Sequence, residues 1–301
     1  MAGVGTLIRA SEFNAIQAKV ALNLGVGSGD RGYGQSLSSA QVSVGDKISV
    51  SQWSNLRTDL LKARQHQTGN DESGNLTIPL NTGLVTEALR AQYDSMADLI
   101  DTNRFDVASN QRTVENLLTP AVRTSAWNGT LTNTITITFA STDAARYFFN
   151  SGGNFQITTT RTGGSSNSKN NTWTTMFDQS GVVTFGRNAT TSNGSSPGTT
   201  YNVGYYNLTT SDQTIYWKPA PSGVYAENDY YIYARTGPSS SQIIITVEYR
   251  DDDTGDQQGG FLPGPAVDEN VDGTLTNTIQ MLRATGSNVS VTAPSATQTG
   301  L

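Results

Sequence analysis

The sequence predicts a mixed α+β protein built from a helical N-terminal module, an all-β domain of sandwich or jelly-roll type, and an extended C-terminal arm. Apolar residues recur at helical spacing through residues 1–119, and they alternate with polar residues through residues 120–250. Residues 251–301 are acidic, then rich in Gly and Pro, and then polar around one strand-like segment. We therefore predict a helical anchoring module, a β-sandwich, and an acidic linker followed by an arm.

The composition favours β-structure with many turns over a metabolic enzyme. Charged residues make up only 15% of the chain, while Thr, Ser, Asn and Gly are abundant. The chain has no Cys and one His, which excludes disulfides and thiolate metal sites, and we expect no cofactor. No apolar run has the length of a signal peptide or a membrane span, so we expect a protein made in a cytoplasm.

The net charge of −6 lies entirely in the C-terminal region. Residues 251–301 hold seven acids and one base (1 − 7 = −6), so residues 1–250 are neutral. The sequence shows no basic patch, which argues against a nucleic-acid partner. Within the acidic run, residues 251–256 suggest either a solvated linker or a calcium site. The run lacks the spacing of an EF-hand, which favours the linker.

The N-terminal module contains an internal repeat of 40 residues. Each copy has an apolar residue, a Ser that can cap a helix, an aromatic residue and two further apolar positions at helical spacing. Ile8, Ser11, Phe13, Ile16 and Val20 align with Ile48, Ser51, Trp53, Leu56 and Leu60. Because two copies are too few for a solenoid, the repeat predicts a pair of helices.

A third, longer helix is predicted for residues 82–118, with Pro120 just beyond its end. Its apolar stripe consists of Leu84, Val85, Leu89, Tyr93, Met96, Ile100 and Phe105. A helix of this length could form a bundle between subunits, and a helix packed within its own module is the alternative. Trp53 and Tyr93 are the interface candidates of the bundle hypothesis.

The β domain is predicted from short alternating segments separated by Gly-rich turns. Leu131, Ile135, Ile137 and Phe139 share one face of the first strand. Further strands are predicted around residues 155–159, 182–184, 215–217, 230–232 and 243–249, and one short helix is predicted for residues 143–149.

The heptapeptide GTLTNTI occurs twice, at residues 129–135 and 273–279. The first copy continues into the predicted sandwich, whereas the second precedes a polar tail. Leu275, Ile279 and Met281 alternate like a strand that has no local partner, and an isolated strand must pair with something. We therefore predict an arm, led by Phe261 and Leu262, that adds a strand to a neighbouring subunit or another protein.

No catalytic constellation is evident, and we predict that the protein is not an enzyme. His66 ends a polar helix, where a solvated imidazole is expected, and it is assigned no catalytic role. The acids of the β region show no obvious pair, so a polysaccharide depolymerase stays an alternative that requires two carboxylates in a cleft. The Gly-rich loop at residues 25–29 follows a helix and lacks Gly-Lys-Ser/Thr, which argues against a nucleotide site.

Aromatic residues gather between residues 201 and 233. Where Tyr residues alternate along a strand, half of them face away from the core, and exposed aromatic rings can stack on sugars or form protein interfaces. The candidates for contact with a host surface glycan are Tyr205, Tyr206, Trp217, Tyr231 and Tyr233. A division of these rings between the core and a protein interface is the alternative.

Three phrases within residues 40–190 carry a resemblance to a known class of proteins. They are VGDKI leading into WSNLR, then AARYFFNSGG, and then TGGSS. Together they resemble virion structural proteins of tailed bacteriophages, especially contractile-tailed phages of cyanobacteria. The resemblance implies a tail, baseplate, neck or fibre component, and it supplies no catalytic residues. We therefore expect a homo-oligomer, trimeric or hexameric, that binds other virion proteins, with host-glycan recognition as the alternative function.

Overall fold

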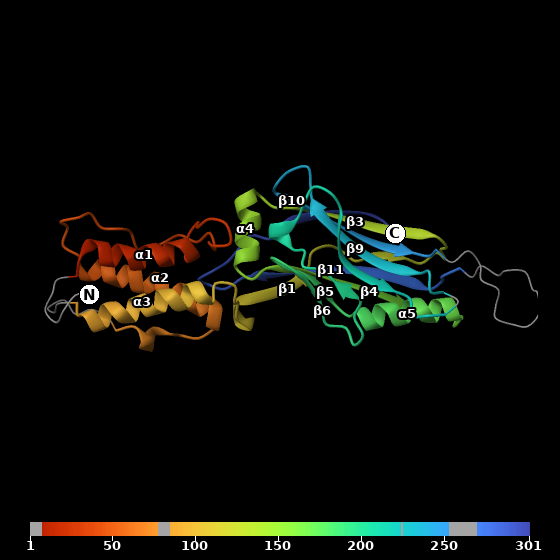
Figure 1. Cartoon of the computed structure of the whole chain (residues 1–301), viewed down its shortest axis with the longest axis horizontal. Coiled ribbons are helices and arrows are strands. Elements are labelled where there is room, and N and C mark those ends of the chain that lie inside the picture. Colours follow the sequence, from red (N-terminus) through yellow and green to blue (C-terminus); the bar gives the residue numbers. More distant parts are fainter. Residues whose placement is uncertain (1–7, 78–84, 224, 253–269) are drawn as a thin grey trace, which may run out of the picture. The chain divides into compact units, whose positions relative to one another are not determined.

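The structure is a computed structural model that describes residues 8–77, 85–223, 225–252 and 270–301. Those residues form five α-helices and two antiparallel sheets of six strands each, which confirms the mixed α+β class (Figure 1). The chain divides into two compact units, each assembled from separate stretches of sequence. The helical unit comprises the described residues of Met1–Thr113, Asp143–Gly153 and Arg283–Ala293; the sandwich unit comprises those of Val114–Thr142, Asn154–Leu282 and Pro294–Leu301.

The helical unit is built on α1 (Ala10–Leu24), α2 (Val50–Thr68) and α3 (Glu87–Thr102), with short 3₁₀ turns at Ser73–Asn75 and Ser109–Gln111. The N-caps of the first two helices are Arg9 and Ser49, each two residues before the predicted caps Ser11 and Ser51, so the offset of 40 is kept. The Glu12 carboxylate accepts a hydrogen bond from the Arg9 backbone N–H at 2.8 Å. The Gln52 side chain accepts the equivalent bond from Ser49 at 2.6 Å.

Equivalent positions of the 40-residue repeat meet in the core of the helical unit. The Phe13 and Trp53 rings lie edge to face, 5.3 Å apart, and Trp53 makes a similar contact with Tyr93 at 4.9 Å. Each of these side chains is at most 1% exposed. The prediction that Trp53 and Tyr93 form an interface between subunits is therefore wrong, because both rings are already buried within their own unit.

The third helix is about half as long as predicted. It ends at Thr102, where the Asn103 N–H closes the last turn on the Leu99 carbonyl. Thr, Asn and Asp crowd this point, and all three have low helix propensity. The chain then forms the strands β1 (Arg112–Asn116) and β2 (Ala121–Arg123). The alternative of a helix packed within its own module is what the structure shows, since Lys19 of α1 reaches Asp94 and Asp98 of α3.

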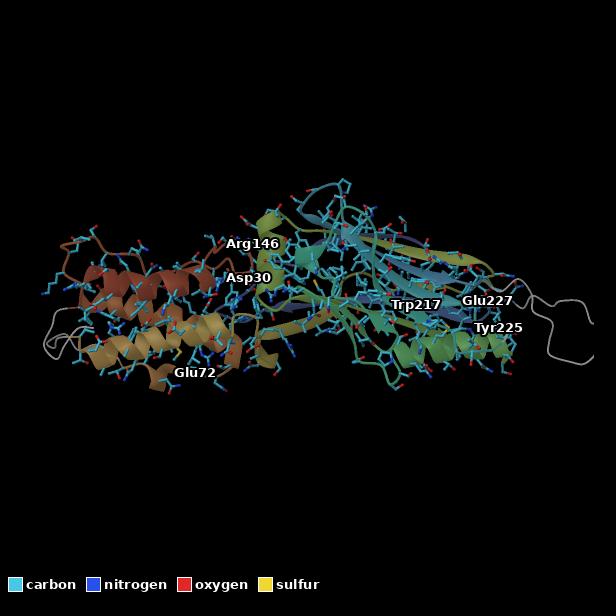
Figure 2. The ribbon with its side chains drawn as sticks, viewed as in Figure 1. Asp30, Glu72, Arg146, Trp217, Tyr225 and Glu227 are labelled. Atoms are coloured by element: carbon cyan, nitrogen blue, oxygen red, sulfur yellow. The ribbon has the colours of Figure 1, made fainter. Side chains whose placement is uncertain are left out.

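Two later stretches complete the helical unit. Helix α4 (Thr142–Asn150) matches the predicted short helix, and its Arg146 donates hydrogen bonds to the Val26 and Arg31 carbonyls. Figure 2 labels Arg146 on α4 and Asp30 in the loop that follows α1. Val289, which lies in the region predicted to be an extended arm, is fully buried, and neighbouring Asn288 is hydrogen-bonded to Gln65. Because the Gly-rich loop after α1 accepts hydrogen bonds from Arg146, it is a structural element of the helical unit.

The sandwich unit contains two sheets. One has the order β1-β11-β4-β5-β6, with β2 also paired to β11, and the other has the order β12-β3-β10-β9-β8-β7. The remaining strands are β3 (Thr130–Thr138), β4 (Asn154–Thr162), β5 (Val183–Phe185), β6 (Thr190–Ser192), β7 (Thr199–Thr200), β8 (Gln213–Pro219), β9 (Asp229–Thr236), β10 (Gln242–Arg250), β11 (Thr274–Ala284) and β12 (Ser295–Gly300). The predicted inward faces of β3, β4, β9 and β10 are confirmed, apart from a half-buried Leu131.

The two GTLTNTI copies begin β3 and β11, one in each sheet, and they meet across the sandwich. The buried side chain of Asn133 donates a 2.9 Å hydrogen bond to Asn277, which occupies the same position of the other copy. Two residues before the copies begin, Trp127 and Val271 exchange backbone hydrogen bonds. Gly129 and Gly273, which open the copies, both have positive φ, at 83° and 92°. The repeat therefore supplies the two facing strands of one core.

This arrangement overturns the prediction of an extended arm that pairs with a neighbour. Strand β11 lies inside its sheet, paired with β4 along most of its length and with β2 near its start. Leu275, Ile279 and Met281 are only 2%, 2% and 5% exposed, because they fill the core of their own sandwich. Phe261 and Leu262 lie outside the described residues. Sequence analysis missed the partner because β4 is separated from β11 by more than 100 residues.

Sequence analysis also missed helix α5 (Ser168–Ser180), which lies between β4 and β5 in the chain. Its residues are mostly Ser, Asn and Thr, which are weak helix formers. The signal that identifies it is the apolar spacing of Trp173, Met176 and Phe177 between an Asn167 cap and Gly181.

Candidate functional site: an aromatic row on the sandwich

Three aromatic side chains form a row on the outward face of the β8–β9 ladder. Trp217, which is labelled in Figure 2, lies directly opposite Tyr231 in the register, and Tyr233 follows Tyr231 two residues later on β9. Their rings are nearly parallel, with interplanar angles of 12° and centroid separations of 6.1 and 5.5 Å. Because Tyr230, Ile232 and Ala234 point into the core, the alternation of β9 keeps the row at the surface.

Charged side chains border the aromatic row. Asp229 accepts a hydrogen bond from the Trp217 indole N–H at 2.6 Å. The Arg250 guanidinium lies 4.8 Å from the centre of the Tyr231 ring and 2.5 Å from a Glu248 oxygen. Burial, reinforced by the Glu248 charge, raises the pKa of Tyr233 to about 12, so its hydroxyl stays protonated and able to donate at neutral pH.

This combination of rings and carboxylates suits a sugar better than an anion. The apolar faces of a pyranose stack on aromatic rings, and its hydroxyls donate to carboxylates such as Asp229 and Glu248. The same contacts also stabilise the sheet itself, since cross-strand aromatic pairs contribute about 0.2–1 kcal/mol each. Carbohydrate binding therefore predicts that removal of a ring weakens ligand affinity, whereas sheet stabilisation alone predicts that removal of a ring lowers only the stability of the sheet.

The structure brings together three of the five residues predicted to contact glycan. Tyr205 and Tyr206 instead pair with each other on the 3₁₀ turn Tyr205–Asn207, with ring centroids 4.9 Å apart. Sequence analysis named Trp217, Tyr231 and Tyr233, and it missed their polar neighbours Asp229, Glu248 and Arg250. Strand alternation would have found Glu248 and Arg250, because both lie on the outward face of β10.

His66 is buried, which contradicts the expectation of a solvated imidazole. It is fully inaccessible in the helical unit, where its ring lies edge to face with Tyr33 at 4.9 Å. Burial lowers the pKa of His66 to about 4, an effect that the nearby Ser151 backbone opposes only in part. His66 is therefore a neutral core residue at physiological pH. The turn of α2 that carries His66 faces the core. Its polar neighbours Arg64, Gln65 and Gln67 led to the prediction of a solvated imidazole.

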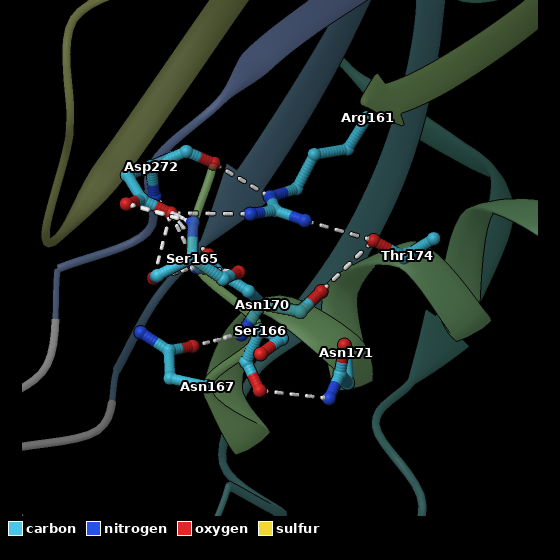
Figure 3. A network of polar contacts seen from close by, with 8 residues as sticks. All are labelled: Arg161, Ser165, Ser166, Asn167, Asn170, Asn171, Thr174 and Asp272. Atoms are coloured by element: carbon cyan, nitrogen blue, oxygen red, sulfur yellow. Dashed lines mark hydrogen bonds and ion pairs between the residues drawn. The ribbon is translucent and has the colours of Figure 1, made fainter. Parts of the chain in front are cut away.

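A second polar cluster fastens the turn after β4 to the start of β11 (Figure 3). The Asp272 carboxylate accepts hydrogen bonds from the Ser165 backbone and hydroxyl, from the Asn170 amide and from Arg161. The Arg161 guanidinium also donates to the Asp272 carbonyl at 2.7 Å. These bonds, the Ser165 backbone bond first, hold the pKa of Asp272 below its usual range. The cluster therefore anchors the loop, because the Arg161, Ser165 and Asn170 donors bind Asp272 of the same chain.

Replacing Asp272 with Asn is expected to release this loop. Asparagine has one acceptor oxygen in place of two, so when that oxygen keeps the Arg161 and Asn170 bonds, its NH₂ faces the Ser165 backbone N–H, which donates to both carboxylate oxygens in the wild type. Hydrogen exchange at the Ser165 amide should become faster, while exchange within β10 should not change. Asp212→Asn is the matched control, because Asp212 is exposed and makes an ion pair with Arg235. Unchanged exchange at Ser165 would contradict the anchoring role.

The described residues hold no group of three or more His, Cys, Asp or Glu side chains arranged to bind a metal. Of the acidic run, Asp252 is about half exposed, but Asp251 is buried in an ion pair with Lys169, which corrects the prediction of a solvated linker at that position. Asp253 and Asp256 lie outside the described residues. No helix among the residues described is long and apolar enough to span a bilayer.

Comparisons of the chain with protein-family models, with curated proteins and with solved structures found no match.

Proposed function

We propose that this chain is a non-enzymatic structural protein of a tailed-bacteriophage particle, located in the virion and assembled with other virion proteins. The observation that carries the proposal is the phrase AARYFFNSGG, together with VGDKI, WSNLR and TGGSS, all of which resemble such proteins. AARYFFNSGG forms α4 and the turn that follows it. The proposed homo-oligomer no longer depends on strand exchange by β11, since that strand is paired within its own chain.

Antibodies against the purified protein provide the test. Immunogold labelling of particles released from the host cell should place the protein on intact virions, and peptides of the chain should co-purify with them through a density gradient. The supernatant after removal of particles serves as the control. Detection of the chain only in that supernatant, at full particle recovery, would contradict a structural role.

We further propose, as a second candidate function, that the aromatic row binds a neutral, hydroxyl-rich surface polysaccharide of the host. The near-parallel rings of Trp217, Tyr231 and Tyr233 beside two carboxylates support this function. Two acids border the row against one arginine, which disfavours strongly anionic sugars.

Trp217→Ala is expected to weaken polysaccharide binding about tenfold, equivalent to about 1.4 kcal/mol. The mutation removes the largest ring of the row and frees the Asp229 carboxylate that holds it. An array of bacterial surface polysaccharides would identify a ligand, and calorimetry would then compare the variants. Tyr206→Ala is the matched control, because Tyr206 is an exposed aromatic residue outside the row. Equal affinity for the wild type and Trp217→Ala would refute this second function.

A further inference from the structure

Lys169 and Asp251 form a fully buried pair inside the sandwich unit. The Lys169 Nζ lies 2.9 Å from a carboxylate oxygen of Asp251, and the exposure of both side chains is 0%. Lys169 belongs to α5, and Asp251 directly follows β10. A buried lysine and carboxylate often cost more in lost hydration than their attraction returns. Stability alone is thus a weak reason for such a pair.

The surroundings of the pair are largely aromatic. Trp173 lies one turn after Lys169 on α5, and Tyr249 lies two residues before Asp251 on the same face of β10. The Trp173 ring contacts Trp127 at 5.1 Å and Tyr249 at 6.5 Å. A low-dielectric environment of this kind favours a neutral amine and a neutral carboxyl group over their charged forms.

The position of Lys169 within its helix acts in the same direction. It is the second residue of α5, whose first turn presents the positive end of the helix dipole. An ammonium group is disfavoured there, whereas the neutral amine is a good nucleophile. Lysines activated in this way, by burial next to positive charge, attack carbonyl carbons in enzymes.

From this geometry we propose that Lys169 and Asp251 condense spontaneously to an isopeptide bond. The Lys169 nitrogen attacks the Asp251 side-chain carbon, forming a C–N bond. One carboxyl C–O bond then breaks, and the hydroxyl oxygen leaves as water with its own proton and one proton from the nitrogen, which keeps the other as the amide N–H. The step needs no oxidant, metal or cofactor, and the folded chain supplies the proximity that makes amide formation feasible.

Asn228 is placed to assist this step. It directly precedes Asp229, whose register partner Arg250 directly precedes Asp251, so Asn228 and Asp251 adjoin the same end of the β9–β10 ladder. Asn228 is fully buried, on the same inward face as Tyr230, and neither atom of its amide has a hydrogen-bond partner among the described residues. Its N–H can donate to the oxygen that becomes negative when the amine attacks.

The mass of the purified full chain tests the proposal directly. The wild type should be lighter than its sequence requires by one water molecule, and Lys169→Arg should have the full mass. After trypsin digestion, residues 162–187 should remain uncut at Lys169 and be joined to residues 251–283 as one branched peptide. Asn228→Ala should slow the appearance of this peptide after refolding, even where the variant folds normally.

A full-mass wild type would refute the proposal without any variant. Loss of water with separate tryptic peptides would also refute it, because an Asp-Gly sequence such as Asp272-Gly273 can lose water by cyclising within one peptide. Only the branched peptide, absent in Lys169→Arg, supports the crosslink. Circular dichroism of Lys169→Arg shows whether that variant is folded, and so distinguishes a missing bond in a folded chain from misfolding. The mass of the wild type tests the proposal whether or not the variant folds.

Discussion

Replacing Asn277 with Ala is expected to lower the free energy of unfolding of the sandwich unit by about 3 kcal/mol. The Asn277 side chain accepts a hydrogen bond from Asn133 and donates one to Thr159, whose hydroxyl also contacts the Tyr230 and Tyr249 hydroxyls. All these groups are buried, so the mutation leaves several polar atoms without a partner in the core. Urea denaturation of the full chain, followed by tryptophan fluorescence, measures the loss.

A double-mutant cycle separates the hydrogen bond from simple loss of volume. Asn133→Leu with Asn277→Leu replaces both partners by apolar groups of similar size, so the double variant should be more stable than either single variant. Ile279→Ala is a control for cavity formation on the same strand. Additive effects of the two leucine substitutions would show that the amides do not interact.

Acidification is expected to destabilise the helical unit through His66 by about 3 kcal/mol. Its folded pKa of about 4 lies below the ordinary value of 6.5, so the folded unit favours the neutral ring. This stability is fully present above pH 6.5 and is lost as the pH falls through 4. Hydrogen exchange of the α2 amides, measured at several pH values, reports on this unit independently of the sandwich.

His66→Phe provides the comparison, because phenylalanine keeps an aromatic ring against Tyr33 and cannot take up a proton. The variant should show a weaker acceleration of α2 exchange between pH 6.5 and 4, after correction for the intrinsic pH dependence. Carboxylates such as Asp101, whose pKa is lowered chiefly by its hydrogen bond with Arg31, contribute their own loss at lower pH. Identical pH profiles for both proteins would rule out His66 as the source.

Local patterns in the sequence predicted the elements whose signals are contained within a few residues. Helical spacing located α1 and α2, and strict alternation located the inward faces of β3 and β10, because each pattern depends on one element and one core. Long-range pairing could not be predicted in this way. The spacing that makes Leu275 and Ile279 strand-like is the same whether β11 pairs with a neighbour or with β4 of its own chain.

The candidate site was predicted in part for the same reason. Alternation placed Tyr231 and Tyr233 at the surface, but the opposition of Trp217 and Tyr231 depends on the hairpin register between β8 and β9. The Lys169–Asp251 pair could not be predicted from the sequence, because Lys169 lies on α5, whose polar composition did not indicate a helix. The charge of Asp251 suggested solvent exposure, and only tertiary structure shows that it is buried.

The late position of β11 and of residues 283–293 constrains how the chain can fold during synthesis. Strand β11 lies between β1 and β4, and Val289 is buried in the helical unit, so both units require residues that are synthesised well after the rest of their cores. Until then, β4 has an unpaired edge and the helices lack part of their cover. Contacts between residues so distant in sequence form slowly, and exposed strand edges favour aggregation in the meantime. Because each unit is assembled from separate stretches of one chain, we expect both cores to be completed slowly and late in folding.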